Sequence, residues 1–293
     1  MTQLTVSPTQ VSFSQGIYQQ NSPVLYCEHD DSSSVVITAA TPFHPVSHIW
    51  PDHPADKGVL VINQQEYKVI DCLVGAWHSE EAYLTIGADI PVKRDEAGWQ
   101  FVVVHRINAS LSITPGTVVS LKVDSDYQQA LSRAHSGAHL AALALNKVLH
   151  SAFWRKAPSR FDTLGHYDFH SYAEETSFVS EDSCLDSYRL GKTLKKRGFN
   201  NDEFIAALTQ VAAQVNAQLQ LWLQTGAKID LVCDGPHLTD SRYWQCQLDE
   251  HKISIPCGGT HISTLQALAD ITVTLAVNAA GNIDMTTRTS KSL

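Results

Sequence analysis

The first 125 residues alternate short apolar runs with turn-forming residues, which is typical of a β-rich domain. The runs are rich in Val, Ile, Leu and aromatic side chains, and residues such as Asn63, Gly98 and Gly116 separate them at short spacing. This spacing favours a small barrel or sandwich. We expect strands at 35–38, 58–62, 67–70, 82–86, 99–104 and 117–123.

The pattern changes to helical spacing after residue 124. Asp124 and Asp126 offer N-caps for a helix through the Ala- and Leu-rich stretch that follows. Apolar residues then recur every three to four positions from Phe204 to Trp222. Because Gly226 follows them, we expect a helix over 202–225 that ends at this glycine. Further apolar runs predict strands at 166–170, 176–179, 229–233, 243–248, 253–255, 271–277 and 283–288.

This order of elements predicts an α+β fold with two domains. A chain of 293 residues is long enough for two hydrophobic cores. We predict an N-terminal small β-barrel domain over residues 1–125. Residues 126–293 are expected to form an α+β domain in which helices pack on an antiparallel sheet.

Composition narrows the class of protein. No apolar run approaches the roughly 20 residues of a membrane span, and the N-terminus lacks the pattern of a secretory signal. We therefore expect a cytoplasmic protein without membrane contact. The six cysteines are scattered without a CxxC pair, so they are expected to be thiols or ligands rather than a disulfide framework. A formal net charge of −9 argues against broad binding of nucleic acid by a basic surface.

The most informative stretch is His135-Ser-Gly-Ala-His139, in a sequence of good helix formers. Two imidazoles four residues apart lie on one helix face, where they can ligate one metal ion. An HxxxH pattern also arises by chance in a chain with 14 histidines. Because Ser136 stands where a zinc metalloprotease needs a Glu as general base, that reaction is excluded.

Two further ligands are needed, and the sequence offers two pairs with Cys-x-x-x-His spacing. In Cys257-Gly-Gly-Thr-His261 the two glycines allow a tight turn and expose amide groups to a ligand. The competing pair is Cys233 and His237. We favour Cys257 and His261 as partners of the helical histidines in one Zn²⁺ site per chain. Such distant pairs are more typical of an active-site cleft than of a zinc finger.

A short basic segment is the second candidate site. If it is helical, Lys192, Lys195 and Lys196 share one face, and Arg197 follows them. Groups of this kind contact phosphates, but they also occur on solvated helix ends. Possible additions to this patch are Arg155, Lys156 and Arg160.

The order of the motifs resembles a known family. The HxxxH helix and the CGGTH turn are similar to those of freestanding alanyl-tRNA editing proteins of the AlaX type and of the editing domain of alanyl-tRNA synthetase. The loop with Thr41-Pro-Phe43 and Pro54-Ala-Asp56-Lys-Gly58 also resembles the T-x-F-x-P…P-x-D-x-G loop of that family. These matches extend over most of the chain.

The resemblance implies a fold and a reaction. It implies a translation-protein-like β-barrel before a zinc-binding editing domain, with zinc held by His135, His139, Cys257 and His261. The implied reaction is hydrolysis of the ester in mischarged tRNA, most simply Ser-tRNA(Ala). A zinc-bound water would act in a pocket lined by Ser136, Gly258, Gly259 and Thr260. The acceptor end of tRNA would contact Lys192, Lys195, Lys196 and Arg197.

The departures from the family leave alternatives open. Residues 46–53 replace the glycine-rich centre of the N-terminal loop, and Ser136 and Ala138 stand where many members carry Thr. The HSxAH form and the Cys233-x-Gly-Pro-His237 segment also resemble the editing domain of threonyl-tRNA synthetase. The rival functions are a non-catalytic tRNA- or zinc-binding module and a zinc hydrolase of small esters or amides. The sequence does not predict the oligomeric state, and it contains no recognisable aminoacylation domain, so ATP-dependent ligase activity is not expected.

Overall fold

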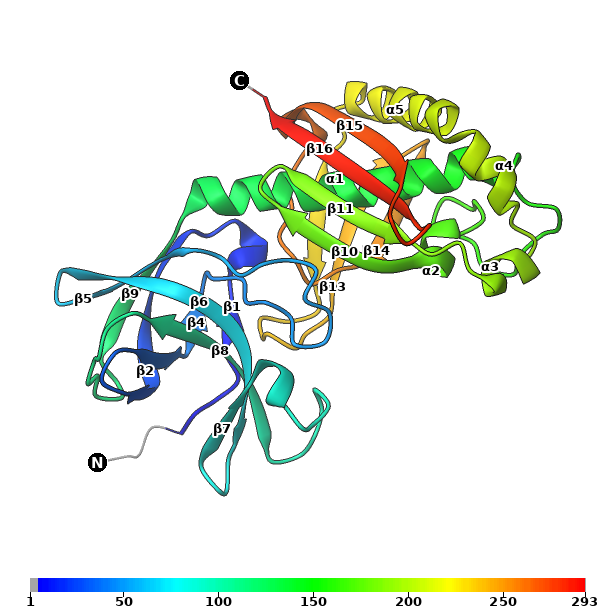
Figure 1. Ribbon diagram of the computed structural model, residues 1–293. Coiled ribbons are helices and arrows are strands. Elements are labelled where there is room, and N and C mark those ends of the chain that lie inside the picture. The colour runs from blue at the N-terminus through cyan, green and yellow to red at the C-terminus, as the bar shows by residue number, and fades with distance from the viewer. Residues whose placement is uncertain (1–4, 293) are drawn as a thin grey trace. The chain divides into compact units, whose positions relative to one another are not determined.

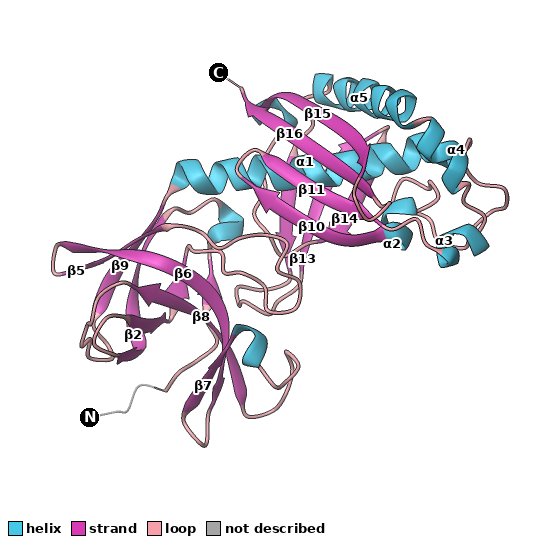
Figure 2. Ribbon diagram, in the orientation of Figure 1, coloured by secondary structure: helices cyan, strands magenta, loops and turns pink. Residues whose placement is uncertain are grey.

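The computed structural model describes residues 5–292, which form two compact units (Figure 1). The first unit contains the chain up to Gln128 together with Cys233–Arg242 and Gly258–Thr260. The second unit contains Gln129–Val232, Tyr243–Cys257 and the chain from His261 onward. Sheets and helices are both present (Figure 2), so the α+β fold class is confirmed.

The first unit is built on a ring-like antiparallel sheet. Its strands pair in the order β5-β9-β2-β3-β8-β6-β7, and an additional pairing of β5 with β6 closes the ring. The bounds are β2 (Gln19–His29), β3 (Ser34–Thr38), β5 (Gly58–Ile62), β6 (Gln65–His78), β7 (Tyr83–Ile86), β8 (Trp99–Ile107) and β9 (Val118–Val123). The short strands β1 (Gln10–Val11) and β4 (Ala40–Thr41) form a separate parallel pair.

Strand β2 is the one long strand of this unit that the sequence pattern missed. Its residues QQNSPVLYCEH contain a short apolar run, Val24–Cys27, between Pro23 and polar residues, and this run is absent from the expected strands. Pro23 lies opposite Val118, and the strand pairs with β3 and β9. The strand is much longer than its apolar run because it pairs with a neighbour on each side.

The second unit packs helices against sheets. Its four-stranded antiparallel sheet has the order β10-β11-β16-β15, and a three-stranded sheet has the order β12-β13-β14. The strand bounds are β10 (Glu174–Ser180), β11 (Ser183–Tyr188), β12 (Ile229–Cys233), β13 (Arg242–Leu248), β14 (His251–Pro256), β15 (Leu268–Val277) and β16 (Ile283–Lys291). The helices are α1 (Ser125–His150), α2 (Phe169–Ala173), α3 (Lys192–Lys196), α4 (Asn201–Ala206) and α5 (Leu208–Gln224).

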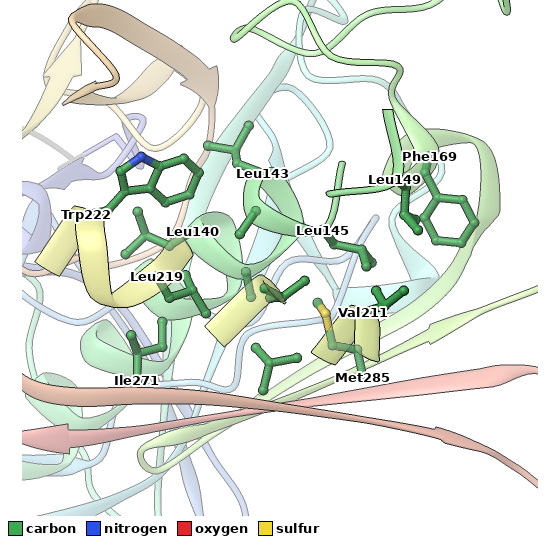
Figure 3. Packing of buried hydrophobic residues seen from close by; sticks show 14 of the residues in the cluster. Leu140, Leu143, Leu145, Leu149, Phe169, Val211, Leu219, Trp222, Ile271 and Met285 are labelled. Carbon is green, nitrogen blue, oxygen red and sulfur yellow. The ribbon is translucent and has the colours of Figure 1, made fainter. Parts of the chain in front are cut away.

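The start of helix α1 and its apolar face both follow from its sequence. The Asp124 carboxylate accepts a hydrogen bond from the Tyr127 amide, which caps the helix as expected. Its apolar face carries Leu140, Leu143 and Leu149, which lie in one buried cluster with residues of α5 and of β15 and β16 (Figure 3). Burial of these side chains holds α1 against the elements around it.

Two local predictions were wrong in detail. Residues 166–170 were expected to be a strand, but Phe169–Ala173 form helix α2, because the Asp168 side chain accepts a hydrogen bond from the Ser171 amide and caps it. The helix expected over 202–225 is interrupted at Ala207, whose backbone (φ −105°, ψ 7°) separates α4 from α5. Gly226, with φ of +59°, follows the end of α5 as predicted.

Among the described residues, none of the helices combines the length and the apolar character that a membrane span requires.

Candidate metal centre

Four side chains of the second unit form a candidate metal site. His135 and His139 lie one turn apart on α1, Cys257 directly follows β14, and His261 comes four residues later. One ligand atom from each of the four lies within 4.8 Å of the others. The structure therefore brings together the two pairs that the sequence placed far apart.

The distances between the donor atoms fit a tetrahedral zinc ion. The Cys257 Sγ lies 3.5 Å from Nε2 of His135, 3.3 Å from Nε2 of His139 and 3.2 Å from Nε2 of His261. Bonds of about 2.3 Å to sulfur and about 2.0 Å to nitrogen at a tetrahedral angle separate these donors by about 3.5 Å. Three imidazoles and one thiolate are a donor set that Zn²⁺ binds readily. The residues present thus fit the ion that the sequence predicted.

Ser136 orients one of these imidazoles. Its buried Oγ lies 3.1 Å from Nδ1 of His261 and accepts a hydrogen bond of 3.2 Å from the Ile262 amide. When His261 donates its Nδ1 proton to this oxygen, Nε2 keeps the lone pair that a metal needs. Ser136, which the sequence analysis placed in the pocket lining, therefore contacts a candidate ligand.

Gly137 sets how closely α1 packs on the four-stranded sheet. A Cβ added at this position would lie 2.7 Å from Cγ2 of Thr289 and 3.4 Å from Cδ1 of Ile271. A side chain here would push away the helix turn that carries both histidines. The glycine in the HSGAH sequence is thus explained by packing between α1 and the strands β15 and β16.

The site is partly shielded from water. His135 is buried, and the other three candidate ligands are half-buried. Burial lowers the pKa of His139 to about 4, with a smaller contribution from the charge of His170. The imidazole of His139 is therefore neutral at neutral pH and retains a lone pair for a metal. The ring of the buried Trp244 lies 5.2 Å from that of His139.

The competing Cys233 and His237 lie in the first unit. The His237 amide donates to the Asp240 carboxylate at 2.7 Å, and Arg242 donates to the His237 carbonyl at the same distance. Within the described residues, the group that could hold a metal consists of the other four side chains. The structure thus assigns this second Cys-x-x-x-His segment to a hydrogen-bonded turn.

Gly258, Gly259 and Thr260 belong to the first unit, although they lie between two candidate ligands in the sequence. Thr260 Oγ1 lies 3.2 Å from Nε2 of His53, and His53 Nδ1 donates to the Pro54 carbonyl at 2.9 Å. A Cβ built at Gly258 would meet no heavy atom within 4 Å. The role of these three residues in a pocket stays a prediction.

The N-terminal loop motif has a structural explanation in the first unit. Thr41 Oγ1 lies 2.9 Å from Nε2 of His105 and accepts a hydrogen bond from the Phe43 amide, while the Asp56 carboxylate accepts one from the His44 amide. A Cβ at Gly58 would lie 2.2 Å from the Lys122 carbonyl oxygen and 2.7 Å from the Phe43 ring. The T-x-F and D-x-G residues thus fix the fold of the loop itself.

Sequence reasoning missed the buried histidines of this loop. His44 and His53 are buried, and their ring centroids are 4.4 Å apart. Burial lowers the pKa of His53 to about 4 and lowers that of His44 well below its usual value. The run of prolines and histidines in the sequence gives no sign of which histidines are buried.

The basic segment is helical: Lys192–Lys196 form α3, and Arg197 directly follows it. Lys192, Lys195, Lys196 and Arg197 are all exposed. In the described part of the chain, no carboxylate lies within ion-pair distance of them. Their contact with tRNA stays a prediction.

Comparison with known proteins supports the resemblance that the motifs indicated. The chain is 26% identical over 183 residues to the alanyl-tRNA editing protein AlaX-M of Pyrococcus horikoshii, a match over 62% of this chain and 65% of that protein. It is 35% identical over 100 residues to the alanine–tRNA ligase of Methanothermobacter thermautotrophicus, and 25% identical over 122 residues to that of Methanosarcina acetivorans.

The chain spans about two thirds of the length of AlaX-M and 11% of each ligase, so these relatives are longer than the part they share. No family model matches the sequence. The predicted resemblance is nevertheless confirmed: the chain is similar in sequence to an alanyl-tRNA editing protein of the AlaX type and to a part of archaeal alanine–tRNA ligases.

Proposed function

We propose that this protein is a zinc-dependent hydrolase that removes a wrongly attached amino acid from tRNA, most simply serine from tRNA(Ala). The observation that carries this proposal is the convergence of three imidazoles and a thiol, within 4.8 Å, in a chain similar to AlaX-M. Ester hydrolysis is a reaction that a zinc site of this composition supports.

One zinc ion would be held by His135, His139, Cys257 and His261. A bound ion at this site supplies a Lewis acid for the ester carbonyl, a water of lowered pKa, or a point of attachment for the substrate amino group. Because a fourth protein ligand fills a tetrahedral site, an exchangeable ligand such as Cys257 is needed where substrate or water binds the metal. The ester bond of aminoacyl-tRNA is labile, so modest polarisation suffices.

The residues around the centre have distinct tasks in this proposal. Ser136 holds the ring of His261 and thereby fixes which nitrogen faces the metal. The amide groups of Gly258 and Gly259 would donate to the ester or to its developing oxyanion. The open space beside Gly258 supports this assignment, since a substrate can approach the backbone there. Thr260 would complete the lining of the pocket.

The substrate would be held at its acceptor end by basic side chains. Among the described residues, the exposed basic side chains of α3 and of the adjoining Arg197 form no ion pair with a carboxylate, in a chain of net charge −9. Contacts limited to one end of a tRNA are compatible with an acidic protein. The residues are Lys192, Lys195, Lys196 and Arg197.

The test is deacylation of Ser-tRNA(Ala), with Ala-tRNA(Ala) and Ser-tRNA(Thr) measured alongside. Wild type, Cys257→Ala and Cys233→Ala are compared, and the metal content of each sample is determined. We expect rapid loss of serine from tRNA(Ala) by wild type and by Cys233→Ala. In Cys257→Ala, both metal and activity should be lost.

The same samples test the rival functions. Turnover of a small seryl ester that does not increase when the ester is attached to tRNA would identify a small-ester hydrolase. Zinc binding without turnover of any substrate would identify a non-catalytic module, for which the changed loop at 46–53 is the supporting feature. Either result contradicts the proposal.

A further inference from the structure

A polar recess lies in the second unit, and its lining residues are distant in sequence from the candidate metal ligands. Its volume is about 290 Å³. Hydroxyl groups and guanidinium groups line it, and no carboxylate does. The lining residues are Ser159, Arg160, Ser171, Tyr172, Thr193 and Arg197.

Tyr172 organises this recess. The Arg197 guanidinium carbon lies 4.3 Å from the centre of the Tyr172 ring, and that of Arg160 lies 5.7 Å from it. The phenol oxygen accepts a hydrogen bond of 2.9 Å from the Arg160 amide and lies 3.4 Å from Ser159 Oγ. Both guanidinium groups lie near the Tyr172 ring, and the Arg160 backbone is hydrogen-bonded to the phenol oxygen. Tyr172 thus holds both arginines beside the same recess.

The two arginines of the recess differ from other arginines of this unit in their ion pairs. Arg133 and Arg189 of the same unit pair with Asp182 and Glu175. In the described part of the chain, neither Arg160 nor Arg197 has such a partner. Burial raises the pKa of Tyr172, but hydrogen bonds from Ser159 and Arg160 and the charge of Arg197 outweigh it and lower this pKa overall. An anion would therefore gain two charge-assisted contacts in this recess.

We propose that this recess binds a backbone phosphate of an RNA strand, held between the guanidinium groups of Arg160 and Arg197. The inference rests on the proposed function, because tRNA is the strand in question. Guanidinium groups match the geometry of phosphate oxygens, and the hydroxyls of Ser171 and Thr193 can donate to the remaining ones.

The surroundings favour a strand over a small phosphorylated molecule. Phe161, next to Arg160 in the chain, is 54% exposed, and its ring lies 5.3 Å from that of Tyr167. Exposed aromatic rings beside cations are surfaces on which bases stack. The lysines Lys192, Lys195 and Lys196 extend the positive charge beyond the recess. A single small phosphate would use neither the ring nor the lysines.

Binding of uncharged tRNA(Ala) tests the proposal without relying on catalysis. The variants are Arg160→Gln and Arg197→Gln, and the matched control is Arg189→Gln, which removes the same charge from an arginine paired with Glu175. We expect each of the first two to raise the Kd about tenfold and to lower the salt dependence of binding by about one charge. The control should bind as wild type does. Thermal unfolding and metal content check that each variant is folded.

Further measurements separate this proposal from the proposed function. Hydrolysis of a seryl ester of adenosine by wild type, which needs no contact with a backbone phosphate, reports the proposed function separately from tRNA binding by the Arg160 and Arg197 variants. If the protein hydrolyses no ester but these variants still lose tRNA binding, the recess is supported and the editing function fails. If Arg189→Gln weakens binding as much as the other two, the recess has no specific role.

A competition assay with inorganic phosphate distinguishes the source of the anion. If phosphate displaces tRNA only at concentrations at which another salt of the same ionic strength does so too, the contact with an RNA strand is supported. Tight phosphate binding that is lost in the two variants, with tRNA binding unchanged, would overturn the proposal in favour of a small phosphorylated ligand.

Discussion

Buried histidines occur in both units, and a comparison of the two sets shows what makes an imidazole a candidate ligand. In the first unit, His105 donates Nδ1 to the Val36 carbonyl at 3.1 Å, and its Nε2 lies 2.9 Å from Thr41 Oγ1. His53 uses the same arrangement with Pro54 and Thr260. Both ring nitrogens are therefore used to connect segments of the fold.

In the second unit the Nε2 atoms of three histidines converge on one thiol instead. Burial depresses the pKa in both places, to about 4 for His105 and for His139. A depressed pKa therefore does not identify a metal site. The difference lies in the partners: backbone carbonyls and threonines in one unit, a soft sulfur donor in the other.

The sharpest test of this comparison exchanges one histidine from each set for alanine. His139→Ala should lose the bound metal and reduce deacylation by at least about 100-fold, because one of four donors is missing. His105→Ala should keep the metal but lower the free energy of unfolding by about 3 kcal/mol, since it leaves a cavity and unpaired partners. Metal analysis and denaturant unfolding measure both. Retention of metal in His139→Ala would contradict the assignment.

A glycine of the first unit tests whether its loop is held by packing. Gly58→Ala places a Cβ against the Lys122 carbonyl oxygen and the Phe43 ring, so we expect a loss of about 3 kcal/mol in unfolding free energy. Gly191→Ala is the matched control, because its nearest neighbours are 3.6 Å or more away. Equal stability of the two variants would show that the loop adapts to the added methyl group.

A substitution at Ser136 tests whether its contact with His261 supports metal binding in the second unit, and zinc affinity is the quantity measured. Ser136→Ala removes the oxygen beside Nδ1 of His261, and we expect zinc affinity to fall about 10- to 100-fold. Thr287→Val is the control, because its buried hydroxyl has no hydrogen-bond partner among residues 5–292. Competition with a chelator of known affinity measures the effect. An unchanged affinity in Ser136→Ala would mean that the hydrogen bond does not orient the ligand.

Asp56 gives the first unit a stability that depends on pH. Burial raises its pKa to about 7, although hydrogen bonds from His44 and Gln128 oppose this. The folded state therefore holds a proton that the unfolded state releases near pH 4, so this contribution to stability is present at low pH and is lost as pH rises toward 7. Between pH 5 and 7 we expect wild type to lose about 2 kcal/mol relative to Asp56→Asn. If the unfolding free energies of the two proteins change with pH in parallel, the pKa of Asp56 lies near its usual value.

The sequence alone determined most of the elements and the residues of the candidate centre. Helix-forming residues located α1, and short apolar runs located most strands but not β1, β2, β4 and β11. Residue chemistry selected His135 and His139 together with two Cys-x-x-x-His pairs, because few side chains bind zinc. The diglycine and the family resemblance favoured Cys257 and His261 of these two pairs. The spacing within each pair could be judged locally, on one helix and on one turn.

Other features depended on the tertiary structure. Strand β2 extends well beyond its apolar run Val24–Cys27 because β3 and β9 pair with it. The local spacing is the same in the two Cys-x-x-x-His segments. The choice between Cys257 and Cys233 therefore depended on which segment lies beside the histidines of α1 in the folded chain. The recess around Tyr172 joins a loop, α2 and α3, so no single stretch of sequence encodes it. Local propensity acts within a few residues, whereas these contacts depend on how the elements pack.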